Sequence, residues 1–292
     1  MQEQDNRKTS PFIAELADDV ASKIMQSGNP VLMPTDLRKV IKENVPQHVT
    51  QRKIIKALID RGFIEEKLLK SESYKDVERI IVPSLQPTPY HYALSLRRKT
   101  YLSHGSAVHL LGLTQQQPRT IYVNKEQSAK PIPQGSLTQE SIDRAFSRPQ
   151  RRSNYVFRID DTQIVLLSGK ATSKAGVIVE ESLNVPITSL ERTLIDITVR
   201  PRYAGGVFQV LQAFMQAIDD INVEKMLKLL RLLDYRYPYH QALGFYLERG
   251  GADATALGQF KELGIDFDFY LDYSMGSTEY DESWKVFYPL GI

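Results

Sequence analysis

The sequence contains no cysteine in its 292 residues, so disulfide bonds and thiolate metal sites are excluded. It also lacks any run of about 18 apolar residues, which excludes a transmembrane helix. The first residues, MQEQDNRKTSPF, lack the apolar core of a signal peptide. Together these absences predict a cytoplasmic protein that has no membrane partner.

Sequence motifs of common catalytic sites are also missing. There is no phosphate-binding GxxxxGK(S/T), no dinucleotide-binding GxGxxG and no GxSxG nucleophile elbow. His104 and His109 are five residues apart, which places them about 140° apart around a helix, a poor arrangement for binding one metal ion. An E-x-K pattern at Glu65 to Lys67 has no paired aspartate upstream. We therefore expect no metal, no cofactor and no enzymatic activity.

Charge is unevenly distributed along a chain whose net charge is only +2. Residues 1–83 carry a net charge of +1, and residues 84–170 carry +7 from 12 basic and 5 acidic side chains. Residues 171–292 carry −6 from 11 basic and 17 acidic side chains. The middle third would suit an anion such as nucleic acid and the last third a basic partner, although solvated faces carry such charges too.

The first 83 residues have the spacing of three helices followed by two strands. One helix opens at Ser10 and Pro11, a second runs from about Thr35 to Asn44, and a third from Thr50 to Arg61. Two apolar stretches, residues 63–69 and 79–82, then bracket the polar turn KSESYKDVE. This order is typical of a winged helix-turn-helix domain.

The third helix carries the residues that we expect to read DNA. Glutamine and arginine pair with adenine and guanine edges in the major groove, whereas lysine suits phosphates. The hairpin would be a wing along the DNA backbone. The predicted DNA-binding residues are Thr50, Gln51, Arg52, Lys53, Lys56, Lys67 and Lys70. A helical domain with a basic outer face could instead be a protein-binding module.

A proline-rich connector follows, and we place the domain boundary there, giving domains at residues 1–85 and 86–292. The second domain opens with YLSHGSAVHLLGLTQQQPRTIYV, residues 101–123. We expect Ser103 to cap a short helix, Gly112 to end it, and a strand to begin at Thr120. A loop is predicted at residues 128–135 and a helix at residues 138–147.

The rest of the chain mixes strands and helices. A hairpin is predicted around Asp160 and Asp161, then a short strand at residues 176–179. Thr188 and Glu191 form a capping-box pattern, and Arg192 and Asp196 are spaced to pair as a helix-surface or domain-tying ion pair. Four helices follow between residues 207 and 263, and residues 266–273 and 284–288 would be the last strands of the sheet. The fold class is therefore α+β: an N-terminal winged helix-turn-helix followed by a larger mixed α/β domain with a helical cluster.

Two basic groups in the middle third form a second candidate surface, for nucleic acid or for a partner protein. Its members are Arg97, Arg98, Lys99, Arg144, Arg148, Arg151 and Arg152. The first three would either touch phosphates beside the DNA-binding domain or lie in an exposed turn.

Two blocks of sequence carry a family resemblance. They are YLSHGSAVHLLGLTQQQPRTIYV, residues 101–123, and ITSLERTLIDITVRPRYAGG, residues 187–206. With the predicted winged domain in front of them, the chain resembles the AbiEi family of antitoxins and transcriptional regulators. These proteins belong to type IV toxin–antitoxin and abortive-infection systems.

The resemblance implies a function in two parts. The N-terminal domain would bind inverted repeats in double-stranded DNA at the promoter of its own operon and repress it. The C-terminal domain would counter a cognate nucleotidyltransferase-type toxin, with or without direct contact. The alternative is a stand-alone winged-helix regulator or interaction scaffold in a phage-defence locus.

Overall fold

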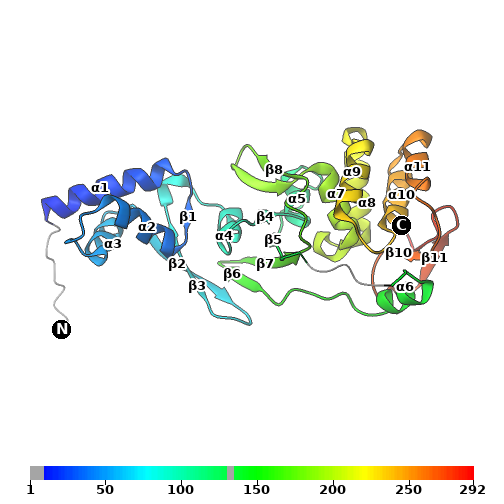
Figure 1. The fold of residues 1–292 in the computed structure, drawn as a ribbon, viewed down its shortest axis with the longest axis horizontal. Helices are drawn as coiled ribbons and strands as arrows, with labels where there is room; N and C mark the ends of the chain where they lie inside the picture. The colour runs from blue at the N-terminus through cyan, green and yellow to red at the C-terminus, as the bar shows by residue number, and fades with distance from the viewer. Residues whose placement is uncertain (1–9, 130–134) are drawn as a thin grey trace. The chain divides into compact units, whose positions relative to one another are not determined.

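The computed structural model describes residues 10–129 and 135–292, so most of the loop predicted at residues 128–135 lies outside the described residues. The chain divides into two compact units. The N-terminal unit extends to Leu96 and includes a later segment, Phe157–Asp161. The C-terminal unit comprises Arg97–Val156 and Thr162–Ile292. Over the described residues the fold is a mixture of eleven α-helices with β-strands (Figure 1).

Three helices open the N-terminal unit, as the sequence predicts. They are α1 (Pro11–Gln26), α2 (Pro34–Asn44) and α3 (Gln51–Asp60). The Ser10 hydroxyl accepts a hydrogen bond from the Ile13 amide, and Pro11 occupies the first turn, which confirms the predicted start of α1. The helices bury one apolar face each in a shared core, to which α3 contributes Ile54, Ala57 and Leu58.

The strands of this unit form an antiparallel arrangement. They are β1 (Val31–Leu32), β2 (Glu65–Ser71), β3 (Val77–Ile81) and β6 (Val156–Ile159). β2 and β3 form the predicted hairpin, with Lys67 opposite Arg79. β1 pairs with β3, and the end of β2 pairs with β6, so that Ser71 lies opposite Phe157.

The predicted connector is wrong in one respect, because it contains a helix. A 3₁₀ turn at Pro83–Leu85 is followed by α4 (Pro89–Ser95). Pro89 lies in the first turn, where the missing amide proton costs nothing. The Thr88 hydroxyl lies 2.8 Å from Nδ1 of His91, and the Thr88 amide donates to the same nitrogen. Proline thus starts this helix instead of excluding one.

The C-terminal unit contains a mixed sheet. Its strands lie in the order β7 (Thr162–Gly169), β5 (Thr120–Glu126), β4 (Tyr101–Leu102), β9 (Val185–Thr188) and β8 (Val177–Glu180). β5 runs parallel to β7 and antiparallel to β4, and β8 and β9 form an antiparallel hairpin. β5 confirms the predicted strand at Thr120, and Gly112 has the expected left-handed backbone, with φ of 72°.

The described part of this unit contains seven α-helices, and the four predicted between residues 207 and 263 are among them. They are α5 (Gly105–Leu110), α6 (Gln139–Phe146), α7 (Leu190–Val199), α8 (Val207–Ala217), α9 (Val223–Leu233), α10 (Tyr239–Gly250) and α11 (Ala254–Lys261). Figure 1 shows α7 to α11 gathered on one side of this mixed sheet. Their shared core includes Phe214, Phe245 and Trp284.

The last strands do not extend the main sheet, so that expectation is wrong. β10 (Phe269–Tyr270), β11 (Thr278–Asp281) and β12 (Val286–Pro289) form a separate three-stranded sheet with β12 in the centre. Phe269 and Val286 are fully buried in the helical core. These strands pack on the helices, and their pairing partners are one another.

Two predicted helix caps are displaced by one residue. α5 begins after His104, which has φ of 50° and makes no capping bond, whereas the Ser103 hydroxyl contacts the His104 ring. α7 is capped by Ser189 and not by Thr188, because the Ser189 hydroxyl accepts the Arg192 amide. The Thr188 hydroxyl instead lies 2.7 Å from that of Thr193.

Candidate nucleic-acid interface

The outer face of α3 gathers the predicted DNA-reading side chains. Gln51, Arg52, Lys53 and Lys56 are all exposed, while Ile54 and Leu58 on the opposite face are fully buried. Thr50 precedes the helix with an exposed side chain that makes no capping bond. The first turn contains no acidic residue, so the positive end of the helix dipole adds to the side-chain charges. This face is therefore electropositive and accessible.

The hairpin presents its two predicted lysines differently. Lys67 donates to the Asp160 carboxylate at 2.8 Å and lies 5.5 Å from the centre of the Tyr92 ring. The hydrogen bond to Asp160 raises the pKa of Lys67, so the side chain is charged but already paired. Lys70 is exposed near the turn, opposite Arg158. Of these two lysines, Lys70 is the better placed for a phosphate.

Arg79 connects the β2–β3 hairpin to the end of α4, a role that the sequence does not reveal. Its side chain is only 6% exposed. The guanidinium donates to the Ser95 carbonyl at 2.8 and 3.1 Å and to the Leu96 carbonyl at 3.3 Å. These carbonyls lie at the end of α4, where a cation is favoured by the helix dipole. Arg79 thus attaches β3 to α4 within the N-terminal unit.

The second candidate basic surface lies on two separate segments of the C-terminal unit. Its first three residues occupy the exposed turn before β4, in which Lys99 has φ of 60°. The others lie in the last turn of α6 and in the chain after it, and all four are exposed. The backbone near them is held because Arg200 donates to the Arg151 carbonyl at 3.2 Å. The side chains of both segments remain accessible to an anion.

The second of the two sequence blocks, residues 187–206, contributes a buried ion pair to the C-terminal unit. Arg192 Nε donates to Asp196 Oδ1 at 2.9 Å, and the two side chains are 4% and 5% exposed. The pairing is as predicted, but it lies in the interior and not on a helix surface. Arg192 also donates to the Ala175 carbonyl at 2.5 Å, while Oδ2 of Asp196 has no hydrogen-bond partner among the residues that the structure describes. Burial raises the pKa of Asp196, and the charge of Arg192 opposes that shift.

The first of the two sequence blocks, residues 101–123, is also anchored in the interior of the C-terminal unit. Tyr101 donates to Glu126, which also accepts the Thr172 amide at 3.1 Å and the Thr172 hydroxyl. His104 is buried against Tyr203, with ring centres 5.5 Å apart in an edge-on contact. Burial lowers the pKa of His104 to about 3, with the charges of Arg200 and Arg192 acting in the same direction. The ring is therefore neutral at pH 7 and packs as an aromatic group.

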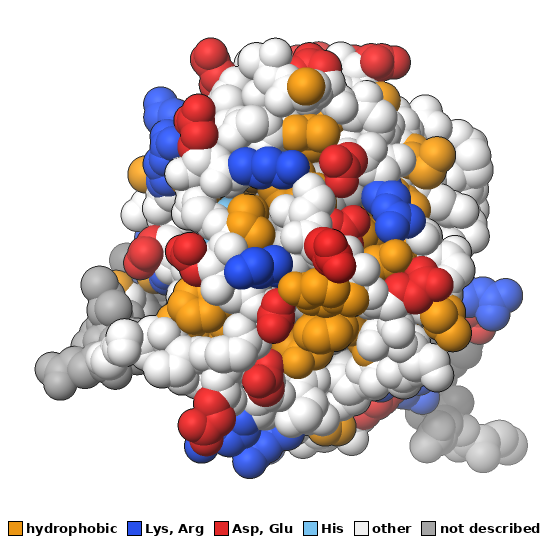
Figure 2. Space-filling view, turned by 90° about the vertical axis from the view of Figure 1, so that its right-hand side faces the viewer, with side chains coloured by type: hydrophobic (Ala, Val, Ile, Leu, Met, Phe, Trp, Pro, Cys, Tyr) orange, Lys and Arg blue, Asp and Glu red, His pale blue; other side chains and the backbone are white. Residues whose placement is uncertain are grey.

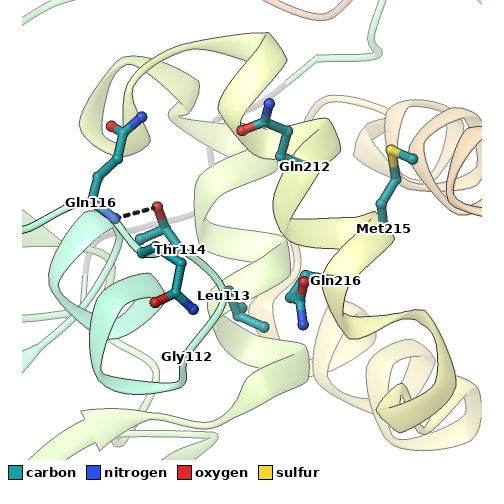
Figure 3. Close-up of a pocket in the computed structure, with 8 residues that line it drawn as sticks. Gly112, Leu113, Thr114, Gln116, Gln212, Met215 and Gln216 are labelled. Atoms are coloured by element: carbon teal, nitrogen blue, oxygen red, sulfur yellow. Dashed lines mark hydrogen bonds between the residues drawn. The ribbon is translucent and has the colours of Figure 1, made fainter.

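A shallow groove of about 450 Å³ lies between α8 and the loop that follows α5. Figure 3 shows Gln212, Met215 and Gln216 on α8 across from Thr114 and Gln116 on the loop. A second pocket of about 360 Å³ shares Thr114 and Gln116. The 11 residues of α8, VFQVLQAFMQA, include no charge, although Phe208 and Met215 are 46% and 55% exposed. Such a surface suits a protein partner better than a phosphate.

Acidic side chains are dispersed on the face that Figure 2 displays. This face lies at the end of the C-terminal unit where α11 and β11 are labelled in Figure 1. Acidic, basic and hydrophobic side chains alternate across it. Acidic side chains are therefore not concentrated into one patch on this face. Among the described residues, no group of three or more histidine, aspartate or glutamate side chains is arranged to hold a metal ion.

Comparison with known proteins adds a likeness of fold. No protein-family model and no curated protein matches the chain. The crystal structure of the RV2827C protein from Mycobacterium tuberculosis is similar, with a TM-score of 0.55 and 17% sequence identity. The alignment covers 94% of this chain and 91% of that chain. The two proteins therefore share an architecture over nearly their whole lengths. None of the described helices combines the length and apolarity needed to cross a bilayer.

Proposed function

We propose that this protein is a DNA-binding transcriptional regulator whose N-terminal unit is a winged helix-turn-helix. The observation that carries the proposal is the accessible face of α3, where Gln51, Arg52 and Lys53 lie together in the first turn. The recognition helix of this class of domain contacts base edges with its N-terminal residues. Arg52 would pair with guanine, Gln51 with adenine, and Lys53 and Lys56 with phosphates.

The hairpin β2–β3 is the wing in this proposal. Lys70 and Lys75 are exposed on either side of its turn and would lie along the phosphate backbone. Lys67 would position the wing through Asp160 and would contribute less to DNA binding directly. Arg79 would hold this wing in place within the N-terminal unit, because its buried guanidinium attaches β3 to the end of α4.

The finer form of the proposal is an autorepressor and antitoxin of a type IV toxin–antitoxin operon. It is supported by the two blocks that resemble AbiEi proteins, residues 101–123 and 187–206. The C-terminal unit would counter a nucleotidyltransferase-type toxin without acting as an enzyme itself. A rescue assay with the toxin gene of the same operon tests this step, comparing the full chain with a chain that lacks residues 1–96. If the toxin binds directly to the exposed face of α8, Met215→Glu on that face should abolish the rescue.

A second candidate is an interaction scaffold, which the charge-free groove beside α8 favours. A gel shift on the upstream promoter distinguishes a DNA-binding regulator from an interaction scaffold. Arg52→Glu with Lys53→Glu should abolish the shift, because both exposed cations are reversed. Lys228→Glu with Arg231→Glu on α9 changes net charge equally and should leave the shift intact. Equal effects of the two pairs would contradict DNA reading by α3.

A further inference from the structure

Strand β6 adds a third strand to the β2–β3 hairpin, although its residues come from much later in the chain. Phe157–Asp161 belong to the N-terminal unit, and β6 pairs antiparallel with the end of β2, with Lys70 opposite Arg158 (Figure 1). Phe157 and Ile159 are 2% and 4% exposed, whereas the Arg158 side chain between them is 56% exposed. Because side chains alternate along a strand, Arg158 lies on the open face of β6.

This open face is the one that the hairpin turns toward the helices α1 to α3. Glu66 and Lys70 share one face of β2, because residues four positions apart on a strand point the same way. Glu66 lies opposite Ile80, which is 2% exposed and belongs to the helical core that includes the buried face of α3. Arg79, on the other face, is bound to the end of α4 instead. Since opposite residues of an antiparallel pair share a face, Lys70 and Arg158 both lie on the α3 side of the hairpin.

Two cations thus lie directly opposite each other beside the turn of the hairpin. Cross-strand partners in an antiparallel pair have Cβ atoms about 4.5–5.5 Å apart, and like charges at that distance repel each other. Glu72 offsets part of this charge, because its carboxylate lies 3.0 Å from Nη2 of Arg158. Both members of that ion pair are exposed, so solvent screens it and it contributes little to stability. Lys70 and Arg158 are therefore placed to bind an anion together.

We propose that Arg158 contacts a DNA phosphate together with Lys70, and that Glu72 holds its guanidinium until DNA binds. The assignment rests on the proposed DNA-binding function and adds to it a residue from outside residues 1–96. A guanidinium matches the geometry of a phosphate with two parallel hydrogen bonds, whereas the phosphate repels the carboxylate of Glu72. The exchange costs little, because the exposed ion pair that it breaks is weak. With Lys75, which is exposed in the turn, three cations then surround the tip of the wing.

Binding of the full chain to the operator and to unrelated DNA at several salt concentrations tests this contact. Arg158→Gln should weaken binding to both DNAs alike, because a phosphate contact carries no sequence information. Loss of one phosphate contact reduces the slope of log affinity against log salt by about 0.9, so the loss of affinity should be about 3.5 times larger at about 50 mM than at about 200 mM salt. Arg158→Lys keeps the charge and should retain the wild-type slope.

Glu72→Gln separates a contact with DNA from a role in holding β6 in place. This substitution breaks the same ion pair, but it should raise affinity for both DNAs, because it frees Arg158 and removes a carboxylate beside the phosphate. Arg61→Gln is the matched control for charge. Arg61 follows the last turn of α3, at the opposite end from the first turn that would read DNA, and its Nη2 lies 2.5 Å from Asp18. Its loss should leave the salt slope unchanged.

Three outcomes would overturn the assignment of Arg158. Unchanged affinity and slope in Arg158→Gln, while Arg52→Glu with Lys53→Glu abolishes binding, would leave the proposed function standing without this contact. Equal losses in Arg158→Gln and Glu72→Gln would show that the ion pair acts by holding β6. If the wild-type chain bound no DNA, the proposed function would fail and the contact with it.

Discussion

Removing the carboxylate of Asp196 is the sharpest test of how the C-terminal unit is stabilised. In Asp196→Ala, the guanidinium of Arg192 would stay in a site where it is 4% exposed and would lose its 2.9 Å partner. Its remaining acceptors, the Ala175 carbonyl and the Thr172 hydroxyl, carry no charge. Breaking one side of a buried ion pair costs about 3–5 kcal/mol, and we expect a loss of that size in the free energy of unfolding.

For the same ion pair, we expect that a second substitution restores part of the lost stability. Replacing both residues, as in Arg192→Met with Asp196→Leu, removes the buried charges together. The double variant should be more stable than Asp196→Ala, because no uncompensated charge remains. An exposed carboxylate provides the control: Asp234 lies 3.5 Å from Lys170 with 69% of its side chain exposed, and Asp234→Asn, which leaves the bonds from Lys170 to the Leu233 and Asp234 carbonyls in place, should cost no more than about 1 kcal/mol.

Urea unfolding followed by tryptophan fluorescence measures these changes within one unit. The chain has a single tryptophan, Trp284, and it is fully buried in the core of the C-terminal unit. Its signal therefore reports unfolding of that unit. A loss below about 1 kcal/mol for Asp196→Ala would refute the reasoning, since Arg192 would then be compensated by something other than Asp196.

Two further predictions use the same fluorescence assay. The pKa of His104 is about 3 in the folded state and about 6.5 in the unfolded state, so below about pH 6.5 the unfolded chain binds a proton that the folded chain does not, and the folded state is destabilised. Between pH 6 and 4 the wild-type protein should lose about 1.4 kcal/mol more per pH unit than His104→Asn, and parallel pH profiles would contradict this. Gly244→Ala would place a Cβ atom 2.1 Å from the Trp284 ring and should cost at least about 1–3 kcal/mol. Gly258→Ala in α11, with no atom within 4 Å of the new Cβ, should not destabilise, and equal losses for the two glycine variants would be the contrary result.

The helices of this protein could be predicted because their apolar spacing is local. α3 buries Ile54, Ala57 and Leu58 on one face, and the same spacing leaves Arg52 and Lys56 outside. The positions of its cationic side chains could thus be anticipated from ten residues of sequence. The sequence does not predict α4, because three prolines at residues 83–89 suggest a bent connector, although proline is equally suited to a first helical turn.

Contacts between distant residues could not be predicted in this way. Lys67 pairs with Asp160 across 93 positions, so the pairing of this lysine within the β2–β3 hairpin depends on where β6 returns to β2. The contacts of Arg79 could not be predicted either, because its carbonyl partners lie at the end of α4, a helix that the sequence does not predict. The pairing of Arg192 with Asp196 was predictable from a spacing of four, but its burial depends on the packing of the whole unit.

Affinity for DNA measured against salt, for the operator and for unrelated DNA, tests the central claim most directly. The account predicts that Arg52→Ala lowers operator affinity by about 1–3 kcal/mol and changes affinity for unrelated DNA far less. Lys56→Ala should weaken both and reduce the slope of log affinity against log salt by about one. If Arg52→Ala weakened both DNAs equally, or left both unchanged, α3 would not be the element that reads sequence.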